Sequence, residues 1–74
     1  MIRVTARLVD GGVQEFTEGD SFITRLHLLQ KSGYEGKELV HELITDDWGA
    51  PPVYVEITGT TSEGENINAR IPYS

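Results

Sequence analysis

Residues 34 to 49, "YEGKELVHELITDDWG", contain the most regular helical pattern in the sequence. The apolar residues recur at i, i+1, i+4 and i+5, the spacing of one helix face: Leu39, Val40, Leu43 and Ile44. Glu35 and Glu38 fall near the N-terminus of this helix, where the macrodipole favours negative charge. The stretch therefore predicts a helix with one buried apolar face and one acidic face.

The C-terminal end of this helix is predicted from charge and from residues that interrupt helices. If the helix continued, Asp47 would turn onto the apolar side, where an unpaired charge is costly. The run Gly-Ala-Pro-Pro at residues 49 to 52 is incompatible with regular helix. We expect the helix to end around Thr45 or Asp46.

The preceding stretch, "EGDSFITRLHLLQKSG" at residues 18 to 33, fits either a helix or a strand. As a helix it would be capped by Asp20 or Ser21 and would end at Gly33 in the left-handed conformation. One apolar stripe would form, with Leu28 pointing away from it: Phe22, Ile23, Leu26 and Leu29. Residues 22 to 28 also alternate as in a strand. The helix is favoured because its caps agree with its period.

The stretch before the first helix has the two-residue period of half-buried strands. In residues 2 to 9, "IRVTARLV", polar side chains alternate with apolar ones, which are Ile2, Val4, Ala6 and Leu8. Residues 10 to 12, Asp-Gly-Gly, form a turn that supplies positive φ and predicts a hairpin. The second strand, "VQEFT" at residues 13 to 17, would anchor in the core through Phe16.

A second hairpin follows the helices. Residues 52 to 59, "PVYVEITG", would bury Val53, Val55 and Ile57, and "NARIP" at residues 68 to 72, with the residues just before it, would bury Ile67, Ala69 and Ile71. Residues 60 to 66, "TTSEGEN", would form the loop between them. The order ββααββ predicts an α+β two-layer sandwich, in which two helices pack on one face of a four-stranded antiparallel sheet.

The length and composition define the broad class of protein. The 74 residues fit a single domain spanning residues 1 to 74. This is near the lower size limit at which an apolar core alone, without disulfides or a structural metal, can stabilise a fold. There is no cysteine, which excludes disulfides and thiolate metal sites and suits a reducing compartment. No stretch approaches the roughly 20 apolar residues of a membrane span, and residues 1 to 10 do not resemble a signal peptide. We expect a soluble cytoplasmic protein without a membrane partner.

Net charge and its placement suggest a binding surface. The formal charge of −6 disfavours contact with nucleic acid or anionic membranes. On the second helix Glu38, Glu42 and Asp46 recur every four residues, and Glu35 flanks them. Such like-charge pairs cost a few tenths of a kcal/mol each. An acidic row of this kind predicts docking to a basic partner, although it also fits an ordinary solvated face.

The residues after the acidic row have two interpretations. Asp46 and Asp47 oppose the macrodipole at a helix C-terminus, at roughly 0.3–1 kcal/mol each when exposed. They either extend the partner-binding surface or shape the turn by accepting backbone N–H bonds. Trp48 either covers the gap between helix and sheet or, if exposed, anchors an interface, as Leu28 would.

An alternative binding surface lies on the predicted outer face of the sheet. Arginines and an aromatic residue share this face: Arg3, Arg7, Arg70 and Tyr54. Single-stranded nucleic acid binds to sheets with such groups. The other interpretation is that the arginines pair across strands with Glu15 and Glu56. A homodimer that packs these sheet faces together is a further alternative.

The sequence gives little support for catalysis. His41 and Glu42 begin an HExxH zinc motif, but Thr45 stands where the second histidine is needed. The serines fall at cap, turn or terminal positions, and no glycine-rich nucleotide fingerprint occurs. We expect no catalytic residue, no metal ligand and no cofactor.

The sequence thus favours a small acidic regulator or inhibitor that binds a basic protein surface and is not an enzyme. Its partner-binding residues would be Glu35, Glu38, Glu42, Asp46, Asp47 and Trp48. The alternatives are single-stranded nucleic-acid binding through the arginine-bearing face and a structural homo-oligomer joined through the sheet face or an edge strand. A special case is a phage or mobile-element inhibitor that presents carboxylates in place of phosphates.

Overall fold

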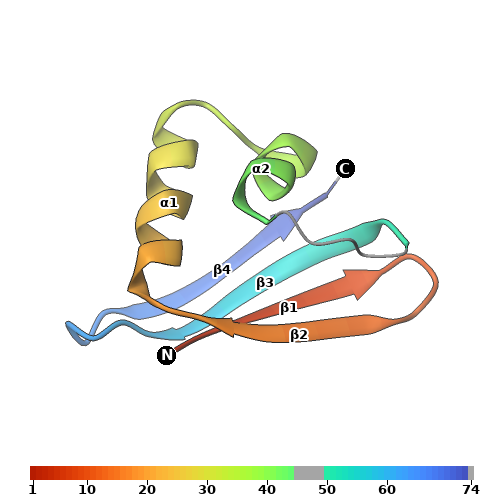
Figure 1. The fold of residues 1–74 in the computed structure, drawn as a ribbon. Helices are drawn as coiled ribbons and strands as arrows, with labels where there is room; N and C mark the ends of the chain where they lie inside the picture. The colour runs from red at the N-terminus through yellow and green to blue at the C-terminus, as the bar shows by residue number, and fades with distance from the viewer. Residues whose placement is uncertain (45–49, 74) are drawn as a thin grey trace.

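The computed structural model describes residues 1–44 and 50–73. These form six elements in the order ββααββ: β1 (Ile2–Leu8), β2 (Val13–Glu18), α1 (Asp20–Lys31), α2 (Gly36–Leu43), β3 (Pro52–Thr60) and β4 (Asn66–Pro72). In Figure 1 both helices lie on the same side of one sheet. The four strands are antiparallel and lie in the order β2-β1-β3-β4. The predicted α+β architecture is therefore confirmed.

The core lies between the sheet and the helices. β1 alternates as predicted, because its even-numbered residues are buried and its arginines are exposed. Ile44, which directly follows α2, is buried together with the apolar side chains of that helix. The buried apolar set is Ile2, Val4, Ala6, Leu8, Phe22, Ile23, Leu26, Leu39, Val40, Leu43, Ile44, Val55, Ile57 and Ile71. Phe16, Ile67 and Ala69 are half-buried at its margin.

Residues 20 to 31 form a helix, which settles the ambiguity between helix and strand. At its end the N–H of Gly33 donates to Gln30 and the N–H of Tyr34 donates to Leu29, the bonding pattern of a Schellman motif. Gly33 has φ +97°, as the sequence predicted. Leu28 points away from the core and is 60% exposed. No helix in the described part of the chain is long and apolar enough to cross a membrane.

The prediction of the N-terminal cap of α1 was wrong. The capping position is Gly19, which has extended backbone and offers no side chain, and the helix begins at Asp20. The Asp20 carboxylate instead accepts bonds from the N–H and the hydroxyl of Ser62, in the β3–β4 loop. The side chain expected to serve its own helix therefore joins two elements that are distant in the sequence.

The predicted end of α2 was also wrong, by about one half-turn. The helix ends at Leu43, and Ile44 already has extended backbone with φ −126° and ψ 121°. Ile44 is nevertheless buried, because the extended backbone still directs its side chain into the core. The apolar pattern that predicted a longer helix is thus satisfied by a residue outside it.

Val53 was predicted to lie in the core, and this prediction was wrong. Arg7 pairs with Tyr54 while Leu8 pairs with Pro52, so Val53 is an extra residue in β3. Such a β-bulge shifts the alternation of side chains by one position. As a result Pro52 is buried and Val53 is 47% exposed. The other two expected residues of this strand, Val55 and Ile57, are fully buried.

β1 approaches β3 closely at Gly59. A Cβ at Gly59 would overlap the carbonyl oxygen of Met1 and lie 3.1 Å from the Cα of Ile2. Gly59 also has φ +136°, which L side chains rarely adopt. The position therefore requires glycine for two separate reasons.

We predict that Gly59→Ala destabilises the fold more than Gly64→Ala, which is the matched control. Gly64 has φ +89° but nothing within 4 Å of a Cβ, so its substitution incurs only the conformational penalty, about 1–3 kcal/mol. Gly59→Ala should lose a further 1–3 kcal/mol or so through overpacking. Urea unfolding of both variants measures the difference, and equal losses would contradict the close approach.

Candidate functional site

The acidic face of α2 is the set Glu35, Glu38 and Glu42. Glu35 is the residue that precedes the helix, and the other two lie one turn apart on it. All three are exposed. Because α2 ends at Leu43, the helical row of acids contains Glu38 and Glu42 and does not reach Asp46. The predicted site residues Asp46, Asp47 and Trp48 lie outside the described residues.

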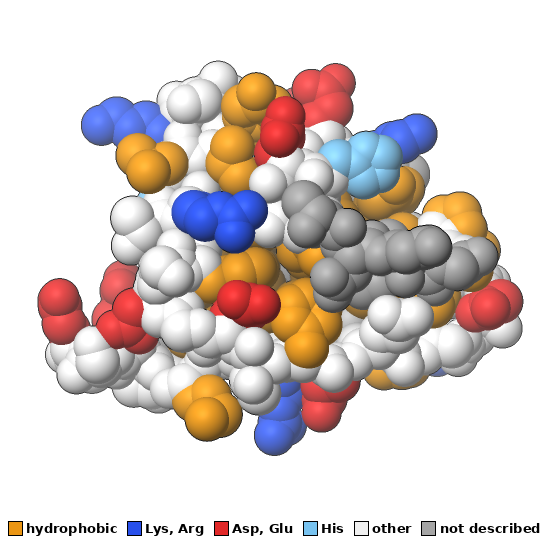
Figure 2. All heavy atoms as spheres, in the orientation of Figure 1, with side chains coloured by type: hydrophobic (Ala, Val, Ile, Leu, Met, Phe, Trp, Pro, Cys, Tyr) orange, Lys and Arg blue, Asp and Glu red, His pale blue; other side chains and the backbone are white. Residues whose placement is uncertain are grey.

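The carboxylates of the acidic face have no cation partner among residues 1–44 and 50–73. Both ion pairs in that part of the chain lie on the outer face of the sheet. Figure 2 shows acidic side chains over the helix layer and at the left-hand end of the molecule, where Figure 1 places the β3–β4 hairpin. The carboxylates of Glu35, Glu38 and Glu42 therefore lie outside the described ion pairs, although Lys and Arg side chains lie over the same layer (Figure 2).

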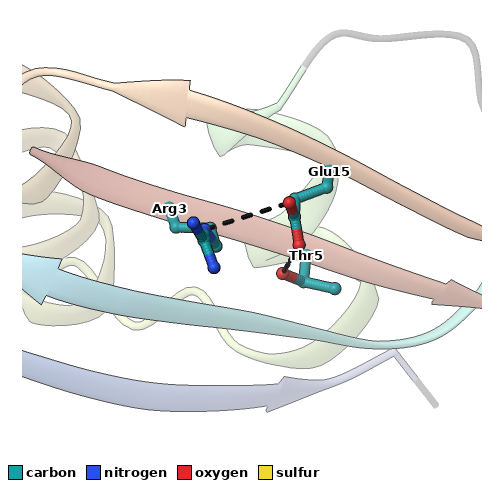
Figure 3. Close-up of polar contacts among 3 residues, drawn as sticks. All are labelled: Arg3, Thr5 and Glu15. Carbon is teal, nitrogen blue, oxygen red and sulfur yellow. Dashed lines mark hydrogen bonds and ion pairs between the residues drawn. The ribbon is translucent and has the colours of Figure 1, made fainter.

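The outer face of the sheet is neutralised by pairing. Arg3 lies 3.9 Å from the carboxylate of Glu15, which also accepts a bond from Thr5 on the neighbouring strand (Figure 3). Arg70 lies 3.4 Å from Glu56. This is the cross-strand pairing that the sequence offered as the alternative to nucleic-acid binding, and it is confirmed for these two arginines.

The remaining members of the arginine-bearing face are Arg7 and Tyr54. The register places them directly opposite each other on β1 and β3. The Arg70 guanidinium stacks over the Tyr54 ring at 4.2 Å, so an arginine already occupies one face of the aromatic ring. Arg7 has no ion pair among the described residues. The face thus retains one uncompensated cation, fewer than the sequence suggested.

Arg25 of α1 holds the C-terminal end of α2. Its Nη2 donates to the backbone oxygen of Leu43 at 2.8 Å and to that of Glu42 at 3.1 Å. The last carbonyls of a helix lack partners within it and carry partial negative charge, so a guanidinium satisfies both needs. The bond goes to the main chain of Glu42 and leaves its carboxylate exposed. The sequence alone does not predict this role, because the contact joins α1 to the end of α2.

His41, the first residue of the incomplete zinc motif, contacts the C-terminal segment. Its Nε2 lies 2.5 Å from the hydroxyl of Tyr73, and the rings meet edge to face. The ammonium group of Lys37, one turn earlier, lies 6.0 Å from the centre of the Tyr73 ring. These contacts tie α2 to the end of β4, so His41 has a structural partner. No cluster of three or more metal-binding side chains occurs in the described ranges.

The Asp20–Ser62 contact perturbs a titrating group. The hydroxyl and the backbone N–H of Ser62 bond to the carboxylate and lower the pKa of Asp20 from its ordinary value. The first turn of α1 is thereby linked to the β3–β4 loop. The shift favours the ionised form of Asp20, which accepts both bonds from Ser62.

Comparison with known proteins gives no relative from which a role could be transferred. No family model matches the chain. No curated protein and no solved structure matches it either.

We predict that Arg25→Met destabilises the protein by about 1–2 kcal/mol, because it leaves the Glu42 and Leu43 carbonyls without their charged donor. Methionine retains much of the aliphatic stem. Lys31→Met on the same helix is the control, and should lose less than about 1 kcal/mol. Chemical unfolding measures both, and equal losses would rule out the capping role.

We predict that Asp20→Asn removes part of the acid sensitivity of folding. The pKa of Asp20 is lowered in the folded state, so its stabilisation is complete above the unfolded pKa and is lost as pH falls through the folded pKa. Stability measured from neutral pH down into the acid range should fall less steeply in Asp20→Asn than in the wild type. A parallel pH profile in the two proteins would contradict the role of this contact.

Proposed function

We propose that this protein is a non-enzymatic interaction module that binds a basic surface of another protein through the acidic face of α2. The observation that carries the proposal is the difference between the two layers of the fold. Glu15 and Glu56 on the outer face of the sheet are paired with arginines, whereas Glu35, Glu38 and Glu42 have no ion pair among the described residues. Complementary charge would steer and orient the partner.

The distribution of charge over the whole sequence supports this polarity. Of twelve acids and six cations, two acids and three cations lie on the outer face of the sheet. Ten acids and three cations remain in the rest of the sequence. One of those three cations, Arg25, is bonded to backbone carbonyls. A basic partner would therefore be attracted to the surfaces of the molecule other than the outer face of the sheet.

The rigidity of α2 also supports recognition. Its apolar face is almost completely buried, with Leu39 and Leu43 2% exposed and Val40 fully buried. Glu38 and Glu42 are four residues apart, so their Cβ atoms are separated by about 5–6 Å on one helix face. Two carboxylates on a packed helix at this spacing can each accept bonds from an arginine or lysine of a partner, and only their side chains would have to become ordered.

The absence of cysteine from the sequence fits a reducing compartment, and we place the interaction in the cytoplasm. We further propose that the protein regulates or inhibits the partner, because a domain of this size can cover part of a partner's surface. Nucleic-acid binding through the sheet face is less well supported, because two of its three arginines are paired and Tyr54 is stacked under Arg70.

The test is quantitative affinity capture from a lysate with wild-type protein and with Glu38→Lys/Glu42→Lys. We expect the wild type to enrich a protein with a basic surface, and the reversed variant to bind it at least about tenfold more weakly. Each lost or reversed contact contributes up to about 1 kcal/mol, and 1.4 kcal/mol corresponds to tenfold in affinity.

The matched control is Glu18→Lys/Glu63→Lys, which changes net charge by the same amount at two exposed acids away from α2. Recovery should be close to wild type for this control. If both double variants reduce binding equally, only net charge matters and the acidic face is not the site. If neither reduces it, the proposed function is wrong.

A further inference from the structure

β4 leaves an open edge whose backbone groups can be assigned. The N–H of Tyr73 donates to Val53 and the N–H of Thr61 donates to Glu65, so odd-numbered residues of β4 face β3. Hydrogen-bonded and non-bonded pairs alternate in antiparallel sheets. The N–H and C=O groups of the even-numbered residues therefore point to the open edge: Asn66, Asn68 and Arg70. In the described part of the chain no strand covers them.

We propose that a second copy of this chain occupies this edge, giving a symmetric dimer in which β4 pairs antiparallel with β4 of the partner. The register that pairs all three open residues places Asn68 opposite Asn68 of the partner and Asn66 opposite Arg70 of the partner. About six backbone hydrogen bonds would form along this ladder. The two sheets would join into one continuous sheet of eight strands.

The side chains on both faces fit this register. On the outer face no like charges meet, because Arg70 lies opposite an asparagine and Asn68 opposite its own copy. On the inner face Ile67 lies opposite Ala69 of the partner, twice about the two-fold axis. Both residues are only half-buried in the single chain, so pairing removes more of their apolar surface from water.

The space beside the edge can hold the partner's hairpin. In this register the chain of the partner continues from its Asn66 into the β3–β4 loop, next to Ile71 and Pro72. A groove of about 950 Å³ lies there, between the end of β4 and the α1–α2 connection, with Lys37 on its wall. Gly36 closes the edge at Pro72, since a Cβ at Gly36 would lie 3.6 Å from the Pro72 oxygen. The ladder therefore ends at Arg70.

The other edge of the sheet is a poorer self-pairing surface. In β1–β2 the N–H of Leu8 donates to Gly12, so the open groups of β2 belong to the odd-numbered residues Val13, Glu15 and Thr17. The equivalent symmetric register would place Glu15 opposite Glu15 of the partner. Like charges directly opposite each other are destabilising. In the register that pairs all three open residues, the charge pattern therefore favours β4 over β2.

A single paired strand buries a small interface, so the dimer is expected to be weak and to form at micromolar concentrations or above. Sedimentation equilibrium over a concentration series measures it. Asn68→Pro should abolish dimerisation, because it removes the outward N–H and leaves every β3–β4 bond in place. Thr17→Pro is the control, since it makes the same change on the β2 edge and should dimerise as the wild type does.

Substituting Asn66 with a negative or a positive residue tests the register, because the two changes should shift the affinity of the dimer in opposite directions. Asn66→Glu places a carboxylate opposite Arg70 of the partner at two symmetric positions and should tighten the dimer severalfold, although it makes each chain more acidic. Asn66→Lys places like charges there and should weaken the dimer severalfold. Thr17→Glu carries the same added charge on the other edge and should weaken the dimer slightly or leave it unchanged.

Several outcomes would overturn the proposal. The proposal is wrong if the wild-type protein stays monomeric at high micromolar concentration. It is also wrong if Thr17→Pro loses the dimer and Asn68→Pro keeps it. Weakening by both Asn66 variants would refute the register. Backbone amide spectra confirm that each variant is folded. None of these substitutions changes the acidic face of α2, so dimerisation through β4 and partner binding through α2 are tested independently.

Discussion

The bond from Arg25 to the last carbonyls of α2 determines how the helix layer presents its charge. A helix of eight residues is too short to be stable alone, so α2 depends on contacts with the rest of the fold. The guanidinium fixes its end at Leu43, and the buried face fixes its rotation. Because Arg25 binds the main chain of Glu42, the carboxylate of that residue stays available to a partner.

The two layers of the fold treat their charges differently. On the sheet, arginines pair with glutamates of neighbouring strands, Arg70 with Glu56 directly opposite and Arg3 with Glu15 diagonally, which leaves that face nearly neutral. On α2 the basic residues Lys37 and His41 both contact Tyr73, and Arg25 of α1 is bonded to backbone oxygens, so no described ion pair includes the acids of α2. The consequence is an outer sheet face whose two glutamates are paired and a helix α2 whose exposed glutamates form no ion pair among the described residues. Partner binding by the helix layer and self-association by β4 therefore use separate surfaces.

The sequence predicted the elements of the fold because local periodicity determines them. The alternation in β1, the stripe in α1 and the left-handed Gly33 were all read correctly. It did not predict features that depend on residues distant in the chain. The bulge at Val53 arises where β3 meets Leu8 of β1, and the partner of Asp20 lies 42 residues away. Ile44 is buried whether helical or extended, so its apolar character could not locate the end of α2.

For the site, the exposed acids were predictable, but the capping by Arg25 required knowledge of how α1 packs on α2.

The most direct test of this account measures the electrostatic potential near each residue. Paramagnetic relaxation of backbone protons by a cationic and by an anionic nitroxide, compared in solution, reports the local potential without any need for a partner. The account predicts a markedly more negative potential beside Glu38 and Glu42 than beside Thr5 and Glu56 on the outer face of the sheet. Equal potentials at the two surfaces, or a more negative sheet face, would contradict it.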